Sequence, residues 1–369
     1  MVRYLSPIDP HVHLRWNEYP NHDFMQWGFD DARAVGLRAV IEQPNTEPAL
    51  TTFETISERI KLVDRFRRNV VHAIHIGLTP NLHQQRTAMA LVMLRGDVLD
   101  RIVSTKTFYV RSTKSGEIEI VDPDYQKYSW ENKARFRYEG PDVGHFEDGE
   151  LFVEKFDPNN PKTHSLRQSP EAEVSQVDRQ LNFAHESGYR GRIVILHTST
   201  YDTIDFVDDF NKRVNPDFKV YFEVTPHHMF LNSDEDYDFM QKHYGNGNLV
   251  KMNPPLRTRE IQERLLHYVL QGRVDIIGTD HAPHPIERKK DSLNPASGIQ
   301  GKPIWPFVVR RLYEEDIRQK ILDNLIFHNS NNIYFHGRLK PRTVEVEYNP
   351  TLWEKYGFNP FSRIDETLK

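Results

Sequence analysis

Asp9-Pro10-His11-Val12-His13-Leu14-Arg15 stands near the start of the chain and follows the short run 4–8, which we expect to be a strand. Side chains alternate between the two faces of an extended strand, so His11 and His13 point the same way and Arg15 follows them. Two imidazoles on one edge can chelate one cation, and neutral imidazole suits zinc, copper, nickel or iron. Because histidines spaced by two also arise by chance, this stretch predicts a metal site only if other strand ends supply further ligands.

The composition limits the kinds of partner and of metal ligand. The chain has 369 residues, and its 48 basic and 53 acidic side chains give a net charge of −5. This charge offers no general attraction to nucleic acid or to an anionic membrane, which favours a small-molecule partner. There is no cysteine, so any zinc must be held by nitrogen and oxygen atoms.

No targeting or membrane-spanning segment is visible in the sequence. The first residues form neither the apolar core of a signal peptide nor an arginine-rich amphipathic stretch, and no run of about 18 apolar residues occurs anywhere. We therefore expect a soluble, cytoplasmic protein.

Strand and helix patterns alternate along most of the chain. Seven segments have the pattern of buried strands, namely 4–8, 38–42, 70–76, 101–104, 192–196, 220–224 and 274–278. Helical spacing is found between them, at 30–37, 55–66, 84–95, 171–186, 203–210 and 259–270. With an eighth strand hidden near His145, the pattern predicts an α/β fold of the (β/α)8 TIM barrel type, because the polar residues gather after the strands.

In such a barrel the carboxyl ends of all strands meet at one mouth, so residues far apart in sequence converge there. The candidates at these ends are His11, His13, Asn45, Lys106, His145, His197 and Asp280. Each has an ordinary alternative when taken alone, such as a helix N-cap for Asp280. Four histidines and an aspartate on one rim nevertheless predict a metal site. His72 and His75 lie inside the third strand, and we expect them to be core residues.

Lys106 does not fit a simple cation site, because its ammonium would repel metal ions and can only donate hydrogen bonds. Its charge must therefore change if it is to take part.

The ordered motifs resemble those of the dihydroorotases, which are cyclic-amide members of the amidohydrolase superfamily. The similar stretches run from residue 9 to about residue 284 and are Asp-Pro-His-Val-His-Leu-Arg (9–15), Gln-Pro-Asn-Thr-Glu-Pro (43–48), Ser-Thr-Lys-Thr-Phe (104–108), His-Phe-Glu-Asp (145–148), His-Thr-Ser-Thr (197–200), Thr-Pro-His-His (225–228), Asn-Pro-Pro-Leu-Arg (253–257) and Gly-Thr-Asp-His-Ala-Pro-His (278–284).

The resemblance implies a centre of two zinc ions. Lys106 would be carboxylated by carbon dioxide, so that a carbamate anion and a hydroxide bridge the two ions. His11, His13, Lys106 and Asp280 would hold one zinc ion, and Lys106, His145 and His197 the other. The hydroxide would be a nucleophile near neutral pH. Asp280 would be the catalytic residue, taking its proton and returning it to the leaving nitrogen.

The substrate is expected to be an anion. The planar guanidinium of Arg15 fits a carboxylate in a bidentate way, and Asn45 adds an oriented donor. The resemblance implies the reversible cyclisation of N-carbamoyl-L-aspartate to dihydroorotate, in pyrimidine biosynthesis. It also implies substrate contacts from His284 and from backbone groups near Leu256. A mobile loop at 112–116 would add a contact from Thr113.

Two features depart from the family pattern. The segment 139–144 before His145 lacks the usual apolar strand, so His164 is the reserve ligand. The chain also begins directly with its first strand, which leaves no room for the β-sandwich of many hydantoinase-like relatives. We therefore expect one barrel domain at 1–340 and, at 341–369, an extension packed on it.

Alternatives stay open for function and partners. The chain could be another cyclic-amide hydrolase, such as a hydantoinase, dihydropyrimidinase or allantoinase, or a silent scaffold that has lost catalysis. A homodimer and a contact with an aspartate transcarbamoylase are further expectations from the family. His227 and His228 follow a strand at the same mouth, and we expect them to support the site or the fold.

Overall fold

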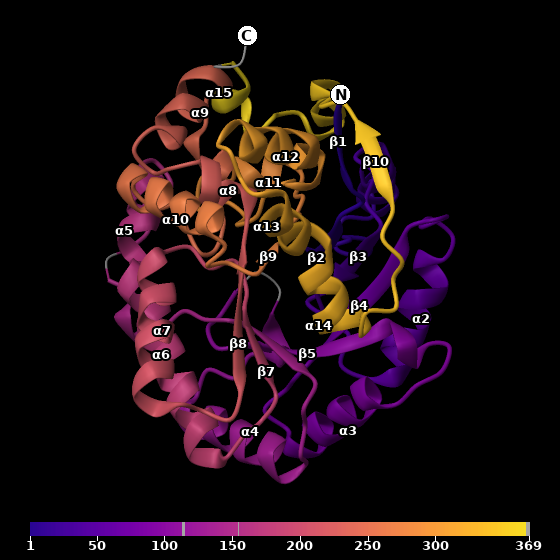
Figure 1. Cartoon of the computed structure of the whole chain (residues 1–369). Helices are drawn as coiled ribbons and strands as arrows, with labels where there is room; N and C mark the ends of the chain where they lie inside the picture. Colours follow the sequence, from indigo (N-terminus) through magenta and orange to yellow (C-terminus); the bar gives the residue numbers. More distant parts are fainter. Residues whose placement is uncertain (113–114, 154, 367–369) are drawn as a thin grey trace.

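The computed structural model describes residues 1–112, 115–153 and 155–366, and it is built around an eight-stranded parallel sheet (Figure 1). The strands follow one another around this sheet in chain order, as β2 (Ile8–Val12), β3 (Ala39–Glu42), β4 (Val71–Gly77), β5 (Ile102–Phe108), β6 (Pro141–His145), β7 (Arg192–Ile195), β8 (Lys219–Val224) and β9 (Ile276–Ile277). Neighbouring strands pair in parallel throughout. The predicted (β/α)8 barrel is confirmed.

The barrel is closed by contacts between its first and last strands. A parallel bridge joins Val12 to His281, and the His13 amide donates to the His281 carbonyl at 2.7 Å. Deeper in the barrel, the Asp9 carboxylate accepts hydrogen bonds from the Thr279 amide at 2.9 Å and from its hydroxyl at 2.6 Å. Burial raises the pKa of Asp9 to about 6, and these bonds offset part of that rise.

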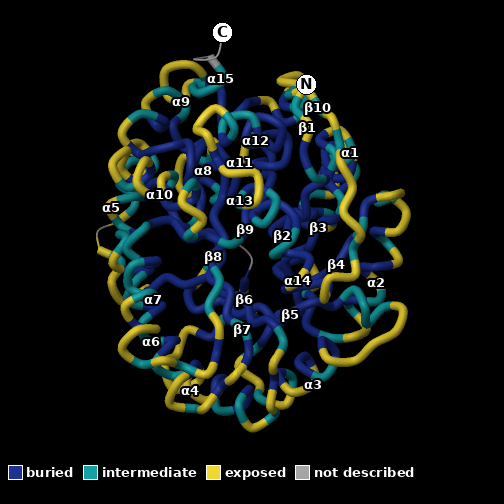
Figure 2. Tube along the Cα trace, in the orientation of Figure 1, coloured by how far each residue is buried: buried dark blue, intermediate teal, exposed yellow. Residues whose placement is uncertain are grey.

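Helices cover the outside of the barrel, and the buried part of the trace lies inside them (Figure 2). The main helices are α1 (Phe24–Ala34), α2 (Phe53–Val63), α3 (Leu82–Met93), α4 (Pro123–Arg135), α6 (Pro170–Ser187), α7 (Tyr201–Val214), α10 (Arg259–Gln271) and α12 (Trp305–Glu314). Helix α2 shows why they form, since Ile56, Ile60 and Val63 make one buried face and Thr52 caps the first turn.

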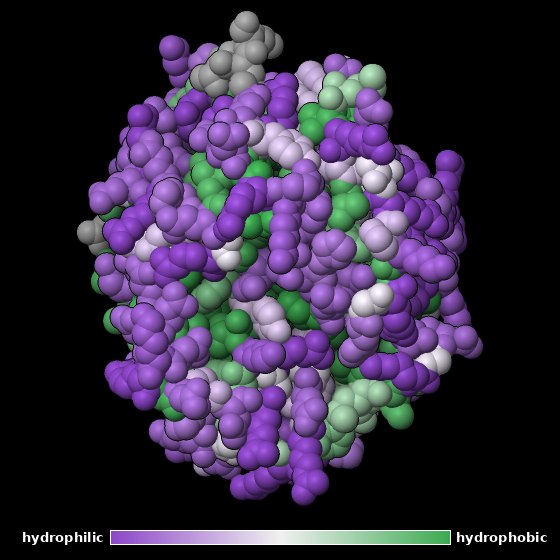
Figure 3. Space-filling view, viewed as in Figure 1, coloured by the Kyte–Doolittle hydropathy of each residue, from purple (hydrophilic) through white to green (hydrophobic). Residues whose placement is uncertain are grey.

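Shorter helices fill the loops, at α5 (Lys162–Arg167), α8 (Pro226–Phe230), α9 (Asp236–Tyr244), α11 (Ile286–Lys289), α13 (Gln319–Asp323), α14 (Asn329–Phe335) and α15 (Ser362–Glu366). The face seen in Figure 3 is mostly hydrophilic, with hydrophobic side chains in the recesses between the helices. None of the helices in the described part of the chain combines the length and the apolar character that a membrane span requires.

The expected first strand at 4–8 is wrong. Residues Val2–Leu5 form β1, which pairs antiparallel with β10 (Thr343–Val346) in a separate two-stranded sheet, and the barrel begins only at Ile8. The chain changes partners between the two, where the Ser6 amide donates to the Arg342 carbonyl and Pro7 accepts from the Arg38 amide.

The C-terminal segment contacts the barrel through buried aromatic and charged groups. Trp353 and Tyr356 are buried, and the Tyr356 hydroxyl donates to Asp31 of α1 at 2.7 Å. The boundary at residue 340 between a barrel domain and a C-terminal extension stays a prediction. Strand β10 of that extension pairs with β1 at the start of the chain.

The eighth strand lies where it was expected, although its sequence Pro-Asp-Val-Gly-His is not apolar. Asp142 is fully buried there and is neutralised by Lys133 of α4, whose Nζ lies 2.9 Å from Oδ2 and 3.9 Å from the centroid of the Trp130 ring. The Thr105 hydroxyl donates to the other carboxylate oxygen at 2.6 Å. A buried ion pair thus replaces the apolar side chains of an ordinary barrel strand.

Replacing Lys133 by methionine is expected to destabilise the protein by about 3–5 kcal/mol, because it leaves the Asp142 charge buried without a partner. Lys127→Met on the same helix is the matched control, since its ion pair with Glu186 is exposed and contributes at most about 1 kcal/mol. Urea denaturation followed by circular dichroism measures both. Equal midpoints for the two variants would show that the ion pair does not stabilise β6.

Candidate metal centre

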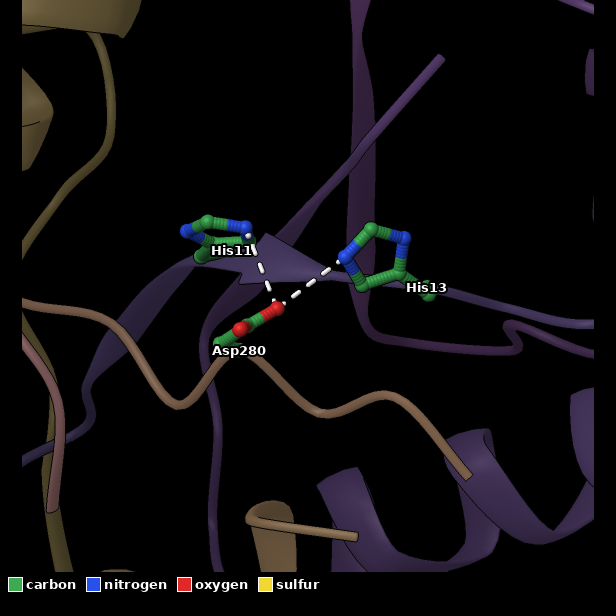
Figure 4. Close-up of side chains that lie close together, drawn as sticks. All are labelled: His11, His13 and Asp280. Atoms are coloured by element: carbon green, nitrogen blue, oxygen red, sulfur yellow. Dashed lines mark hydrogen bonds and ion pairs between the residues drawn. The ribbon is translucent and has the colours of Figure 1, made fainter. Parts of the chain in front are cut away.

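Three side chains at the carboxyl ends of the first and last barrel strands converge at the mouth of the barrel (Figure 4). Asp280 Oδ1 lies 3.2 Å from His11 Nε2 and 3.0 Å from His13 Nε2. One ligand atom from each residue falls within 4.8 Å of the others, and all three residues are buried. This spacing suits a single cation bound by two imidazoles and a carboxylate.

Backbone strain accompanies the site at two strand ends. His197 and Asp280 have φ values of 38° and 46°, a left-handed region that residues other than glycine rarely adopt. Such conformations persist where surrounding contacts enforce them, and they cluster at functional sites. Here they turn the two side chains toward the barrel mouth.

Glu223 at the end of β8 orients His11 from behind. Its Oε1 lies 2.7 Å from His11 Nδ1, so a proton on Nδ1 leaves the Nε2 lone pair facing Asp280 and a cation. Burial raises the pKa of Glu223 to about 8, and the His197 amide and Lys106 oppose this rise. A cation bound at His11 Nε2 would further favour the ionised carboxylate. Burial also lowers the pKa of His11 and His13 well below 6.5, which keeps both imidazoles in the neutral form that binds metals.

A second pair of histidines lies beside this group. The rings of His145 and His197 are 4.6 Å apart between centroids, and His197 is 5.4 Å from His11. His145 Nε2 lies 2.6 Å from Glu147 Oε2, a contact that repeats the carboxylate support of His11. His164 lies elsewhere, with its Nε2 2.9 Å from both the Met252 carbonyl and Asn253 Oδ1.

Lys106 of β5 lies at the same mouth and is buried. Its Nζ is 4.4 Å from the centroid of the Phe108 ring. Burial lowers the pKa of Lys106 from 10.5 to about 7, against the opposing charges of Glu223, Asp280 and Asp142. A sizeable share of this amine is therefore neutral at neutral pH.

A cavity opens above these groups. Its walls contain the predicted residues His11, His13, Arg15, Asn45, Lys106, His145, His197 and Asp280, together with Phe108, Ser112, Asn253, Ala282, Ser297 and Gly298. Arg15 is only 2% exposed and donates from Nη1 to the Asn45 carbonyl at 3.3 Å. It is also 3.8 Å from Glu18, a distance that leaves a loose ion pair.

Two predicted substrate contacts lie outside this lining. His284 is buried one layer behind it, with Nδ1 2.7 Å from the Tyr19 hydroxyl and Nε2 2.9 Å from the Ser297 carbonyl. Leu256 is fully buried, and its carbonyl accepts a hydrogen bond from Ser165 at 2.7 Å. Thr113 lies outside the described residues.

The other histidines have structural surroundings. His72 contacts Glu42 at 2.9 Å and His75 contacts the Pro10 carbonyl at 3.0 Å, as expected of core residues. His228 bridges Thr225 and the Pro254 carbonyl. Within the described part of the chain, neither ring nitrogen of His227 has a hydrogen-bond partner.

Several residues of the site were missed by the sequence analysis. Glu223 and Glu147 support histidines, and Asn253, Ser297 and Gly298 form the wall of the cavity. Glu223 could have been found from the sequence, because it is an acidic residue inside an otherwise apolar strand. Nothing in the loop around 297 distinguished it from other polar loops.

The residues fit a metal centre by their own chemistry. Nitrogen and oxygen donors are grouped and buried, and two imidazoles have a carboxylate behind them. His197 Nδ1 is buried without a hydrogen-bond partner in the described chain, as expected of a site that an ion completes.

No protein-family model matches the chain, but individual relatives do. The dihydroorotase of Archaeoglobus fulgidus is 29% identical over 329 residues, which are 89% of this chain and 71% of that protein. The dihydroorotases of Halobacterium salinarum and Thermococcus kodakarensis are each 28% identical and match 80% of this chain. The chain spans 63% and 59% of the length of these two relatives.

Solved structures share the fold. The L-hydantoinase of Arthrobacter aurescens aligns with a TM-score of 0.76 and 19% identity over 92% of this chain and 72% of its own. The dihydroorotase of Saccharomyces cerevisiae in complex with 5-fluoroorotic acid aligns with a TM-score of 0.69 and 17% identity, covering 91% of this chain and 86% of its own. The chain is therefore a relative of the dihydroorotases in sequence, as its motifs predicted, and it shares the barrel fold of solved dihydroorotase and hydantoinase structures.

Proposed function

We propose that the protein is a dihydroorotase, which reversibly cyclises N-carbamoyl-L-aspartate to (S)-dihydroorotate with release of water in pyrimidine biosynthesis. The observation that carries the proposal is a buried arginine, Arg15, in the same cavity as the grouped histidines, Lys106 and Asp280. Dihydroorotases among the relatives support it. Because the chain spans only part of their length, the activity is a proposal.

Two zinc ions would be held by the residues already grouped at the barrel mouth. His11, His13 and Asp280 would bind one ion, His145 and His197 the other, and a carboxylated Lys106 would lie between them. Bound zinc would supply a water molecule acidic enough to act as a nucleophile near neutral pH.

Lys106 is suited to this modification by its burial. Only the neutral amine adds carbon dioxide, forming a carbamate as its nitrogen bonds to carbon and releases a proton. The lowered pKa of Lys106 supports this step, since the neutral form is abundant at neutral pH. The product is an anion, which removes the repulsion between an ammonium and two cations.

Asp280 would move the proton of the reaction. It lies against both His11 and His13, and burial raises its pKa while the charges of Lys106 and Arg15 oppose that rise. In the hydrolytic direction it would accept a proton as the nucleophile forms and return it to the ring nitrogen that leaves. In the synthetic direction the proton would move in the reverse sense, from the ring nitrogen through Asp280.

Arg15 and Asn45 would hold the carboxylate of the ring. The Arg15 Nε has no hydrogen-bond partner among the described residues, although it is buried, so a ligand carboxylate would satisfy it. Backbone groups near Leu256 and the loop with Thr113 stay predicted contacts, and His284 would act through Ser297. A homodimer and a contact with an aspartate transcarbamoylase also stay predictions.

Purified enzyme loaded with zinc and bicarbonate is expected to hydrolyse dihydroorotate at least about 100-fold more efficiently, by kcat/KM, than hydantoin or allantoin. The reason is that only dihydroorotate presents a ring carboxylate to Arg15. Absorbance of the three rings measures turnover. Hydrolysis of hydantoin or allantoin without dihydroorotate turnover would instead establish another cyclic-amide hydrolase.

The same assay on Arg15→Met tests the reason for this preference. The variant should lose about 100-fold in kcat/KM on dihydroorotate, because a buried charge-assisted bidentate contact is removed. Any activity on hydantoin should change far less. An equal loss on both rings would mean that Arg15 supports the fold of the loop rather than the carboxylate.

Metal analysis can separate His145 from His164 as the ligand. His145→Ala is expected to reduce bound zinc from about two ions per chain to about one, because a ligand of the second ion is lost. His164→Ala, an equally buried histidine, should retain the full amount. Atomic absorption on desalted protein gives both values, and the opposite result would assign the role to His164.

A further inference from the structure

Ser297 and Gly298 form part of the wall of the cavity that the predicted metal ligands also line. Three successive carbonyls of this segment, at residues 296, 297 and 298, each accept a hydrogen bond from a buried side chain. The segment 296–298 is called the wall segment below. Loops rarely have such complete side-chain support, since their carbonyls usually face water.

Lys289 supplies two of these bonds. Its Nζ donates to the carbonyls of Ala296 at 3.0 Å and Gly298 at 2.9 Å, and also to the Lys251 carbonyl at 2.8 Å. An ammonium has three N–H donors, so three carbonyls satisfy it completely. Lys289 is only 1% exposed, and all three of these acceptors are backbone carbonyls rather than carboxylates.

His284 supplies the third bond. The Ser297 carbonyl can only accept, so the proton of the imidazole is on Nε2, and Nδ1 accepts from the Tyr19 hydroxyl. Both ring nitrogens are thus engaged by the protein. His284 is therefore placed to support the wall segment from behind.

Lys251 fastens the wall segment to the neighbouring loop. Its Nζ donates to the Ser297 hydroxyl, and its carbonyl accepts from the Gly298 amide at 2.9 Å. Asn253, two residues further along, lines the same cavity. The two loops consequently form one surface.

Gly298 shows how closely this surface is packed. Its φ is +128°, and an added Cβ would lie 2.8 Å from the Ala282 Cβ and 3.0 Å from His284 Nε2. A side chain there would push the wall segment into the cavity or away from its supports. The backbone itself is what faces a ligand at this point.

We propose that Lys289 and Lys251 are positioning residues that fix the wall segment as the surface against which the cyclic substrate lies. They thereby set the affinity for the ring and leave the bond-breaking step to the metal ligands and Asp280. The inference rests on the proposed function only in taking this cavity as the site of a cyclic amide.

Steady-state kinetics of Lys289→Met test the proposal. We expect KM to rise about 10-fold or more, because a displaced wall segment no longer fits the ring, while kcat per bound zinc changes less than about twofold. A purely structural role would lower the active fraction, and hence kcat, without changing KM. Lys290→Met is the matched control, since Lys290 is the exposed neighbour, and both constants should stay at the wild-type values.

Lys251→Met covers the case in which Lys289→Met does not fold, as judged by thermal melting. It removes one side-chain bond to Ser297, keeps the backbone contacts, and should raise KM in the same way. Unchanged KM in the folded variants, or a fall in kcat alone, would overturn the proposal.

The ring used is the one that the wild type turns over fastest among dihydroorotate, hydantoin and allantoin. Failure of the proposed dihydroorotase activity is then seen in the wild type, before any variant is compared. If no ring is turned over, calorimetric binding of dihydroorotate replaces KM by Kd. A wild type that neither turns over nor binds a ring overturns both proposals.

Discussion

Closure of the barrel is the constraint on which the rest of the structure depends. The first barrel strand and the last are separated by most of the chain, yet the His13 amide bonds to the His281 carbonyl and Asp9 accepts two bonds from Thr279. This pairing places Asp280 within 3.2 Å of two imidazoles. Without it, the donor atoms would sit on opposite edges of an open sheet, and no single cation could reach them.

The site is then shaped by the distribution of buried charge. Acidic side chains lie behind His11 and His145 and orient their rings, and burial favours the neutral form of His11. Lys106 is the exception, because it is a buried amine among groups that would bind cations. Its burial favours the neutral amine. The proposed carbamate would replace this amine by an anion, which would reduce the repulsion between two adjacent cations. Arg15 adds positive charge to the wall of the same cavity, where an anionic ring would lie.

The periodicity of the sequence was sufficient to predict the barrel and the strand ends that carry the proposed metal ligands. It could not place β1, since pairing of Val2–Leu5 with Thr343–Val346 depends on contacts between the two ends of the chain. Strand β6 was expected only because a barrel of this type has eight strands, since its own sequence is not apolar. Burial of Asp142 in this strand depends on Lys133, which lies on another element. The support of His11 by Glu223 and of the wall segment by Lys289 likewise arises from tertiary contacts, which local patterns do not contain.

Anomalous diffraction at the zinc absorption edge, from crystals of protein purified with zinc and bicarbonate, examines the central claim most directly. We expect two peaks, one beside His11, His13 and Asp280 and the other beside His145 and His197. Between them, the density at Lys106 Nζ should extend to a planar carboxylate that contacts both peaks. A bare Lys106 ammonium that is remote from any ion, in protein treated this way, would contradict the claim.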